Sequence, residues 1–240
     1  MTSSGTTRPA DSAPVLTLDG PGGSGKGTVG QRLASRLAWH FLDSGALYRA
    51  VALLARQAGM GCDDTAALAR LAHELDVAFE PREHEPARMM LNGVDVSEAL
   101  RTEEMGRAAS EVAVLPGVRR ALLDKQRVLR RPPGLVADGR DMGTVVFPDA
   151  AVKIFLTATP EARAERRYKQ LKDKGFDVSL ARLAEGIHAR DARDAEREAS
   201  PLKPADDACI IDTSSLTITE VVARIMRLLR ARLETARVER

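Results

Sequence analysis

Gly20-Pro-Gly-Gly-Ser-Gly-Lys-Gly-Thr28 decides the fold of this 240-residue chain because of the sequence on either side of it. The apolar run Val15 to Leu18 precedes it and predicts a buried strand, while Val29, Leu33 and Leu37 follow it at helical spacing. Glycines let backbone N–H groups turn inward around phosphate oxygens, and a following helix adds the positive end of its dipole. The order strand, loop, helix therefore predicts a phosphate-binding loop.

Lys26 closes the glycine-rich run and is expected to neutralise charge on the β and γ phosphates of ATP. The next residue is Gly27, so the first hydroxyl comes one position later, at Thr28, than in loops whose hydroxyl ligates Mg²⁺. We expect Mg²⁺ to accompany ATP, held by phosphates and water, and we predict no direct protein ligand for it. The residues expected to bind ATP are Gly20, Pro21, Gly22, Gly23, Ser24, Gly25, Lys26, Gly27 and Thr28.

A second strand–turn–helix unit follows, with Trp39–Leu42 as the strand and Ala46–Ala58 as the helix. Three later runs, Leu135–Ala137, Val152–Leu156 and Cys209–Ile211, are short, apolar and bounded by polar residues, as buried parallel strands are. The sequence therefore predicts the α/β fold of phosphate-loop NTPases, with a five-stranded parallel sheet flanked by helices.

A stretch of different character interrupts this pattern after the second unit. Val77–Glu80 and Met89–Leu91 are predicted to be short strands, and Asn92-Gly93 supplies a tight turn into a third, Val94–Val96. We expect a small inserted antiparallel lobe that hinges over a ligand. The expected parts are a disordered tail at 1–13, a single domain at 14–238 with its core at about 14–60, 120–160 and 178–238, the inserted lobe at about 61–119, and a short helical lid at about 161–177.

The composition of the chain limits the classes of partner that we expect it to bind. Lys and Arg number 36 against 34 Asp and Glu, and aromatic residues make up 3% of the chain, so we expect no nucleic-acid partner. Cys62 and Cys209 have neither metal-ligand nor redox spacing, which fits a reducing compartment. No apolar run approaches the roughly 20 residues that a membrane span needs. We expect a cytoplasmic monomer with no membrane partner.

Two turns after predicted strands carry anion-binding groups. Ser44 offers a hydroxyl at a helix N-terminus, and Arg49 follows about one turn later. Arg140 and Asp141 come after the third strand, at the sheet edge where ligands of parallel α/β proteins bind. Beside a phosphate loop, Arg140 is interpreted as a phosphate clamp. The alternatives are an ordinary helix cap with a surface Arg, and a polar loop pair.

A third charged group lies on a helix. The apolar stripe of Leu180, Leu183, Ala184 and Ile187 continues as Arg190, Asp194 and Arg197 on the same face. We expect this helix to bury its first half and to point these charges into a cleft; the alternative is an ion pair on a solvated helix end. The helix before it carries Arg163, Arg166 and Arg167, and we interpret it as a lid, with a solvated basic helix as the alternative.

Five motifs together resemble the bacterial cytidylate kinase family of P-loop nucleoside monophosphate kinases. They are GGSGKGT (22–28), LDSGALYR (42–49), DGRDMGTVVFP (138–148), KIFLTA (153–158) and ARDARDAEREASPL (189–202). The resemblance covers the chain from Pro14 to the last helix and includes the insert, which resembles an enlarged monophosphate-binding lobe. It implies transfer of the γ-phosphate of ATP to CMP or dCMP, giving CDP or dCDP.

The resemblance also implies roles for individual residues. Ser44, Arg49, Arg140, Arg190 and Arg197 would approach the acceptor phosphate, Asp194 would take the pentose hydroxyls, and Ser110, Arg119 and Asp141 would read the cytosine edge. Tyr48 lies within the same acceptor motif. Lys26, Arg140 and Arg197 are the expected catalytic residues.

Two alternatives stay open at the level of sequence, one within the kinase class and one outside it. The same machinery could phosphorylate UMP, AMP or a small hydroxylated metabolite. A nucleotide-dependent switch or interaction module is the alternative from another class, although the chain has no Asn-Lys-x-Asp sequence for guanine. An acceptor that brings its own phosphate is favoured by the several Arg residues around the phosphate loop.

Overall fold

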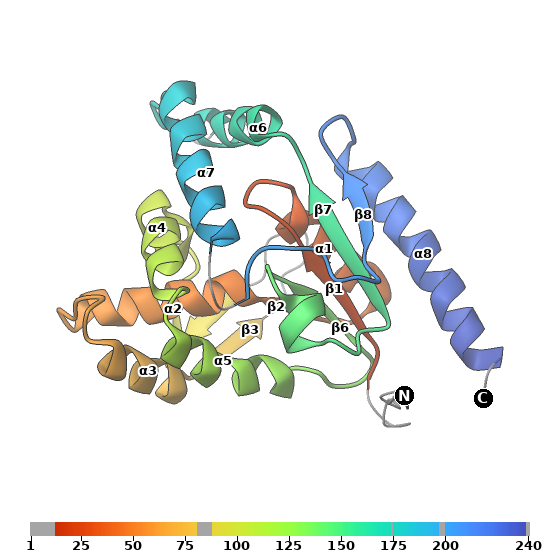
Figure 1. Cartoon of the computed structure of the whole chain (residues 1–240), viewed down its shortest axis with the longest axis horizontal. Helices are drawn as coiled ribbons and strands as arrows, with labels where there is room; N and C mark the ends of the chain where they lie inside the picture. The colour runs from red at the N-terminus through yellow and green to blue at the C-terminus, as the bar shows by residue number, and fades with distance from the viewer. Residues whose placement is uncertain (1–12, 81–87, 174, 197–199, 239–240) are drawn as a thin grey trace.

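The computed structural model describes residues 13–80, 88–173, 175–196 and 200–238 (Figure 1). A five-stranded parallel sheet forms its centre, in the order β2-β6-β1-β7-β8. The strands are β1 (Val15–Asp19), β2 (His40–Asp43), β6 (Leu135–Asp138), β7 (Val152–Thr157) and β8 (Cys209–Asp212). The predicted α/β fold with five parallel strands is confirmed, and each strand ends one residue later than its apolar run.

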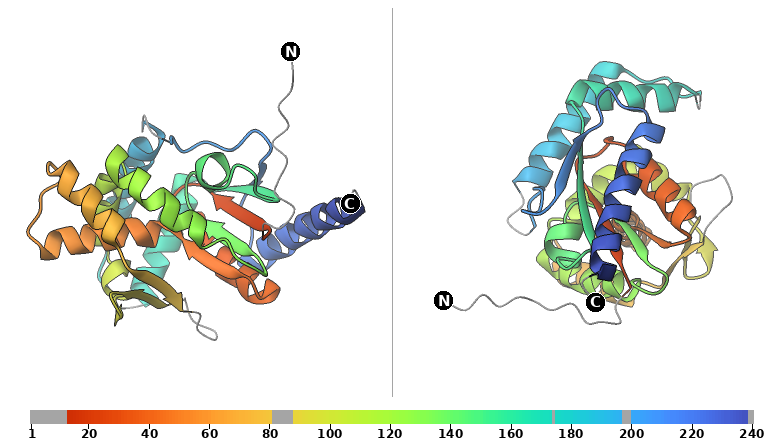
Figure 2. Two further views of the ribbon diagram at one scale, coloured as in Figure 1. Left: turned by 90° about the horizontal axis from the view of Figure 1, so that it is seen from below. Right: turned by 90° about the vertical axis from the view of Figure 1, so that its right-hand side faces the viewer.

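Alternation along the strands divides the core between the two faces of the sheet. Leu16 and Leu18 pack with α1 (Lys26–Leu37) and α8 (Ile218–Val238) on one face. The opposite face, which takes Val15, is covered by a second cluster that includes residues of four helices. These are α2 (Ser44–Gln57), α3 (Thr65–Glu74), α4 (Glu103–Val112) and α5 (Pro116–Val128). Figure 2 shows α8 on the side of the molecule away from α2 and α3.

The insert contains the predicted antiparallel sheet. Its strands are β3 (Val77–Glu80), β4 (Arg88–Leu91) and β5 (Val94–Asp95), in the order β3-β4-β5, followed by the 3-10 helix η1 (Ala99–Arg101). The sheet carries Met89 and Leu91 into the same core cluster as α2 and α5, so the lobe is packed onto the domain.

Two helices and a short turn complete the site end of the sheet. α6 (Pro160–Asp173) directly follows β7, and α7 (Leu180–Ala195) packs against α6 beyond the end of the sheet to which β7 points (Figure 1). The five-residue π-helix η2 (Met142–Val146) follows β6 and packs against β1. Among the described residues, no helix is long and apolar enough to cross a membrane.

The expected tail of residues 1–13 falls mostly outside the described residues. Its last member, Ala13, is buried, and its carbonyl accepts a hydrogen bond from Arg130 Nε at 2.7 Å. Ala13 therefore belongs to the folded domain, one residue earlier than the predicted boundary.

Candidate active site

The glycine-rich loop is shaped by positions where a side chain would not fit. A Cβ on Gly20 would stand 2.0 Å from Leu156 O, and Gly23 and Gly25 have φ values of +80° and +93°, in the left-handed region that glycine favours. Gly25 is also the N-cap of α1, and no side chain caps this helix. The first amides of α1 therefore face the loop as donors for an anion.

Lys26 and Asp138 are buried beside this loop. Lys26 Nζ donates to Pro21 O at 2.9 Å, across the loop, and Asp138 ends the neighbouring strand β6. Burial lowers the pKa of Lys26 to about 7, helped by the positive charges of Arg140 and Arg190. Burial, together with the charge of Asp43, raises the pKa of Asp138 to about 6. The site disfavours an uncompensated Lys26 charge, so an anion bound here stabilises the cationic form.

Arg140 and Arg190 come from different elements and meet at the phosphate loop. A Cβ on Gly22 would stand 3.5 Å from Arg140 Nη2 and 3.5 Å from Arg190 Nη1. Arg140 Nε donates to Asp194 Oδ2 at 2.7 Å, whereas Arg190 Nε is buried and has no hydrogen-bond partner among the described residues. Burial, and then the charge of Arg140, lower the pKa of Arg190 to about 10. Two neighbouring guanidinium groups with spare donors form a receptor for a phosphate.

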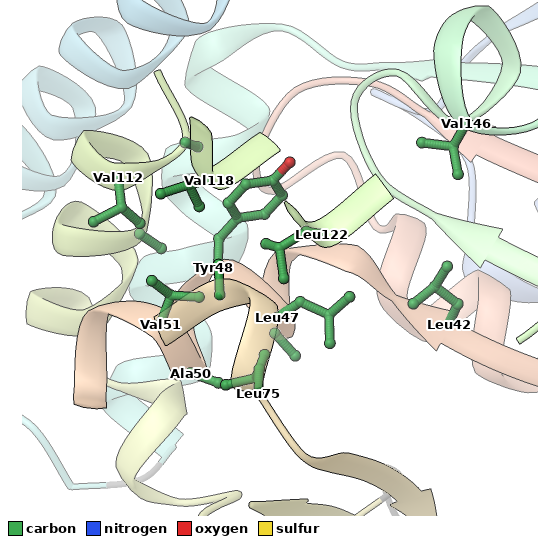
Figure 3. Packing of buried hydrophobic residues seen from close by; sticks show 14 of the residues in the cluster. Leu42, Leu47, Tyr48, Ala50, Val51, Leu75, Val112, Val118, Leu122 and Val146 are labelled. Carbon is green, nitrogen blue, oxygen red and sulfur yellow. The ribbon is translucent and has the colours of Figure 1, made fainter. Parts of the chain in front are cut away.

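A second group of polar side chains lies on the lobe side. Arg119 on α5 forms an ion pair with Asp141, and its Nη1 donates to Ala113 O at 3.1 Å. The Arg119 guanidinium lies over the Tyr48 ring, 5.8 Å from the centroid. Figure 3 shows this ring packed near Val118 and Leu122, with its hydroxyl pointing away from both. Tyr48 therefore supports Arg119 from the core side.

Ser110 on α4 is buried, and its hydroxyl has no partner within the described chain. A buried hydroxyl in this state can still donate and accept.

The turn after β2 is organised by Asp43. Its Oδ1 accepts from Ala46 N at 3.0 Å as the N-cap of α2, and its Oδ2 accepts from Arg49 Nη2 at 2.8 Å. Ser44 is buried in the first turn of α2, and a Cβ on Gly139 would stand 2.7 Å from its hydroxyl oxygen. The turn thus lies against the backbone that carries Arg140.

The three Arg residues of α6 occupy different environments. Arg163 is buried: its Nη1 donates to Gly22 O at 3.1 Å, and it forms an ion pair with Asp191 at 2.5 Å. Arg166 donates to the hydroxyl of Thr213, and the partly exposed Arg167 pairs with Glu103 of α4. Arg163 therefore joins α6 to the phosphate loop and to α7, a contact that the sequence does not reveal.

Burial along α7 differs from the prediction. Leu180 is exposed, and Asp194, near the other end, is the buried residue of this helix. The ion pair with Arg140 explains the burial of Asp194. Arg197, expected to be catalytic and to bind the acceptor phosphate, lies outside the described residues.

Three neighbouring strands end in aspartates that sequence reasoning gave no role. They are Asp43 of β2, Asp138 of β6 and Asp19 of β1. The signal was present, because each follows an apolar run directly, at the edge where parallel strands place their ligands. The fold and the glycine-rich loop are those of a P-loop kinase, and the side chains of Arg140 and Arg190 lie beside the loop.

Comparison with known proteins identifies the family of this chain. The cytidylate kinase family model matches residues 16–231. Cytidylate kinase from Aeromonas salmonicida is 56% identical over 89% of this chain and 93% of its own. Cytidylate kinase from Methylococcus capsulatus is 58% identical over 88% of this chain and 95% of its own. Among solved structures, shikimate kinase from Bacteroides thetaiotaomicron is 14% identical over 90% of this chain and 98% of its own, with a TM-score of 0.45. This chain belongs to the cytidylate kinase family.

Proposed function

We propose that this protein transfers the γ-phosphate of ATP to CMP or dCMP, giving ADP and CDP or dCDP. The observation that carries the proposal is the meeting of Arg140 and Arg190 at Gly22 of the phosphate loop. An acceptor phosphate bound by both guanidinium groups would lie next to the γ-phosphate held by the loop. Relatives more than 50% identical over most of their length are cytidylate kinases, which supports CMP as the acceptor.

The proposal divides the binding of the two phosphate groups among several side chains. Lys26 and the first amides of α1 hold the ATP phosphates, and Arg140 and Arg190 hold the acceptor phosphate, with Arg197 proposed to join them. In-line positioning and compensation of the transferred charge account for the catalysis. The acceptor phosphate is already an anion, so no general base is required.

Base recognition is assigned to Ser110, Arg119 and Asp141. Cytosine has an exocyclic amine donor beside a ring nitrogen and a carbonyl acceptor, so a carboxylate paired with an Arg complements it. Uracil has a carbonyl in place of that amine and is expected to bind less well. Asp194 is proposed to take the pentose hydroxyls, and the lobe (61–119) and lid (161–177) to close over the nucleotides.

The residues around the loop fit an Mg²⁺ ion that arrives with ATP. We propose that phosphates and water hold the ion; in the part of the chain that the structure describes, no cluster of three or more His, Cys, Asp or Glu suited to a metal is found. Asp138 Oδ2 lies 3.4 Å from the position of a Cβ on Gly27, so Asp138 is the carboxylate placed to accept hydrogen bonds from that water. The ion supplies charge compensation for the β and γ phosphates. We also propose that the protein is a monomer and that it is located in the cytoplasm.

A panel of acceptors tests the assignment. Steady-state kcat/KM is measured with ATP and Mg²⁺ for CMP, dCMP, UMP, AMP and shikimate in a coupled ADP-release assay. CMP and dCMP are expected to be the best acceptors. Higher kcat/KM for UMP, AMP or shikimate would refute the acceptor while leaving the P-loop kinase class intact.

A further inference from the structure

Asp19 joins the phosphate loop to the loop that carries Arg140 and Asp141. It is the last residue of β1, directly before Gly20, and its side chain is buried. Its Oδ1 accepts from Met142 N and its Oδ2 from Gly143 N, both at 2.8 Å. These two amides follow Arg140 and Asp141 immediately in the chain. A single carboxylate therefore fixes the backbone next to both acceptor-binding side chains.

Asp141 stands at the N-cap of η2, yet it does not act as a cap. An Asp at this position usually turns its carboxylate back to accept from the second or third amide of its own helix. The Asp141 carboxylate makes no such bond and pairs with Arg119 instead. The second amide, that of Gly143, is already bonded to Asp19.

We propose that Asp19 is a positioning residue for base recognition: by binding the amides of Met142 and Gly143, it leaves the Asp141 carboxylate free to face Arg119 and the cytosine. This inference rests on the proposed function. Without Asp19, the amide of Gly143 is unpaired, and it is the second amide of η2, to which an N-cap Asp such as Asp141 usually turns its carboxylate. Asp141 would then turn away from the base.

Gly143 makes this contact possible. A Cβ at this position would stand 2.9 Å from Thr17 Oγ1 and 3.3 Å from Asp19 Oδ2, so a side chain would push η2 away from β1. The hydroxyl of Thr17 is buried and has no hydrogen-bond partner in the described structure. The polar connection from β1 to the start of η2 therefore runs through Asp19, and Gly143→Ala weakens it without changing the carboxylate.

The charges around Asp19 come from three elements. Asp141 precedes η2, and Lys26 begins α1. Lys153 of β7 contributes the third charge. Its Cδ lies 3.2 Å from the Cβ position of Gly143, and its Nζ pairs with Asp207 at 2.8 Å. Burial raises the pKa of Asp19 to about 7, the charge of Asp141 adds to this, and the two amides and Lys26 oppose it. Protonation leaves a carboxyl that accepts both amides less well. Preference for CMP over UMP is expected to fall as the pH drops through this range.

The experiment measures the ratio of kcat/KM for CMP to that for UMP, in which effects common to both acceptors, including phosphate ionisation, cancel. Asp19→Asn and Gly143→Ala are expected to lower this ratio about tenfold, the scale of one hydrogen bond to a charged group. Asp64→Asn is the matched control, because Asp64 caps α3 through Ala67 N at 3.0 Å, outside the acceptor site. Its ratio is expected to be unchanged. In an Asp141→Ala background, Asp19→Asn is expected to cause no further fall.

The possible results separate the proposed function from the role of Asp19. A wild-type protein without preference for CMP refutes the proposed function itself. A wild-type preference that survives in folded Asp19→Asn, or that falls equally with and without Asp141, overturns the role of Asp19. If Asp19→Asn does not fold by circular dichroism, Gly143→Ala and the wild-type pH profile decide. A ratio unchanged in Gly143→Ala, or constant in the wild type through the pKa range of Asp19, also overturns it.

Discussion

Replacing Arg163 by Met is expected to destabilise the protein strongly. Arg163 donates from Nε to Ala158 O at 3.0 Å and from Nη1 to Gly22 O at 3.1 Å, and both of its terminal nitrogens bond to Asp191. Met keeps an unbranched apolar side chain but removes every one of these donors. The change therefore leaves two carbonyls and one carboxylate without their partner.

The size of the expected loss of stability follows from the burial of the ion pair between Arg163 and Asp191. Removing one partner of a buried ion pair costs about 3–5 kcal/mol. The Asp191 side chain is 27% exposed, so water reaches the remaining charge and places the loss at the lower end, about 3 kcal/mol. For a protein of this size, that loss corresponds to a fall in Tm of about 6–12 °C.

Urea unfolding followed by circular dichroism measures this loss without reference to activity. Arg167→Met is the matched control, because Arg167 is 33% exposed and its partner Glu103 is 62% exposed. Exposed pairs contribute about 0–1 kcal/mol. A free energy of unfolding for Arg163→Met within about 0.5 kcal/mol of the wild type, or a control that loses as much as Arg163→Met, would refute the buried link between α6, the phosphate loop and α7.

Asp141→Ala is expected to lower the CMP-to-UMP ratio of kcat/KM at least about tenfold, through loss of a charged hydrogen bond to the base; an unchanged ratio would remove Asp141 from base reading. Arg140→Met is expected to lower kcat for CMP, UMP and AMP alike, by about 10²–10³-fold, because it holds the phosphate common to them. ADP release measures this, and a loss confined to one acceptor would contradict it. Binding of ATP at about pH 8 is expected to take up protons, because the phosphates raise the lowered pKa of Lys26. Calorimetry in buffers of different ionisation enthalpy detects the uptake, and a heat independent of buffer would count against it.

The sheet could be predicted from sequence because buried parallel strands are short apolar runs. The last residue of each strand was harder to predict. An aspartate ends β1, β2, β6 and β8, and its polarity assigns it to the following turn. Backbone pairing, not side-chain polarity, decides where a strand ends. The aspartates of β1, β2 and β6 therefore lay outside the predicted strands, although they stand at the edge where parallel sheets bind ligands.

The glycine-rich loop could be predicted, because Gly20–Thr28 is one contiguous motif between a strand and a helix. Long-range pairing could not be predicted from spacing. The bond from Arg163 to Gly22 O joins residues 141 positions apart, and the bonds from Met142 and Gly143 to Asp19 join residues 123 and 124 apart. A helical Arg looks the same in sequence whether it is solvated or buried against a carbonyl.

The identity of the products distinguishes phosphoryl transfer to CMP from hydrolysis of ATP. ³¹P nuclear magnetic resonance of ATP, Mg²⁺ and CMP with the wild-type protein follows every phosphorus atom at once. CDP and ADP are expected to appear in equal amounts, with no inorganic phosphate beyond the background of ATP alone. Inorganic phosphate released with ADP while CMP stays unchanged would contradict it and favour a nucleotide-hydrolysing switch.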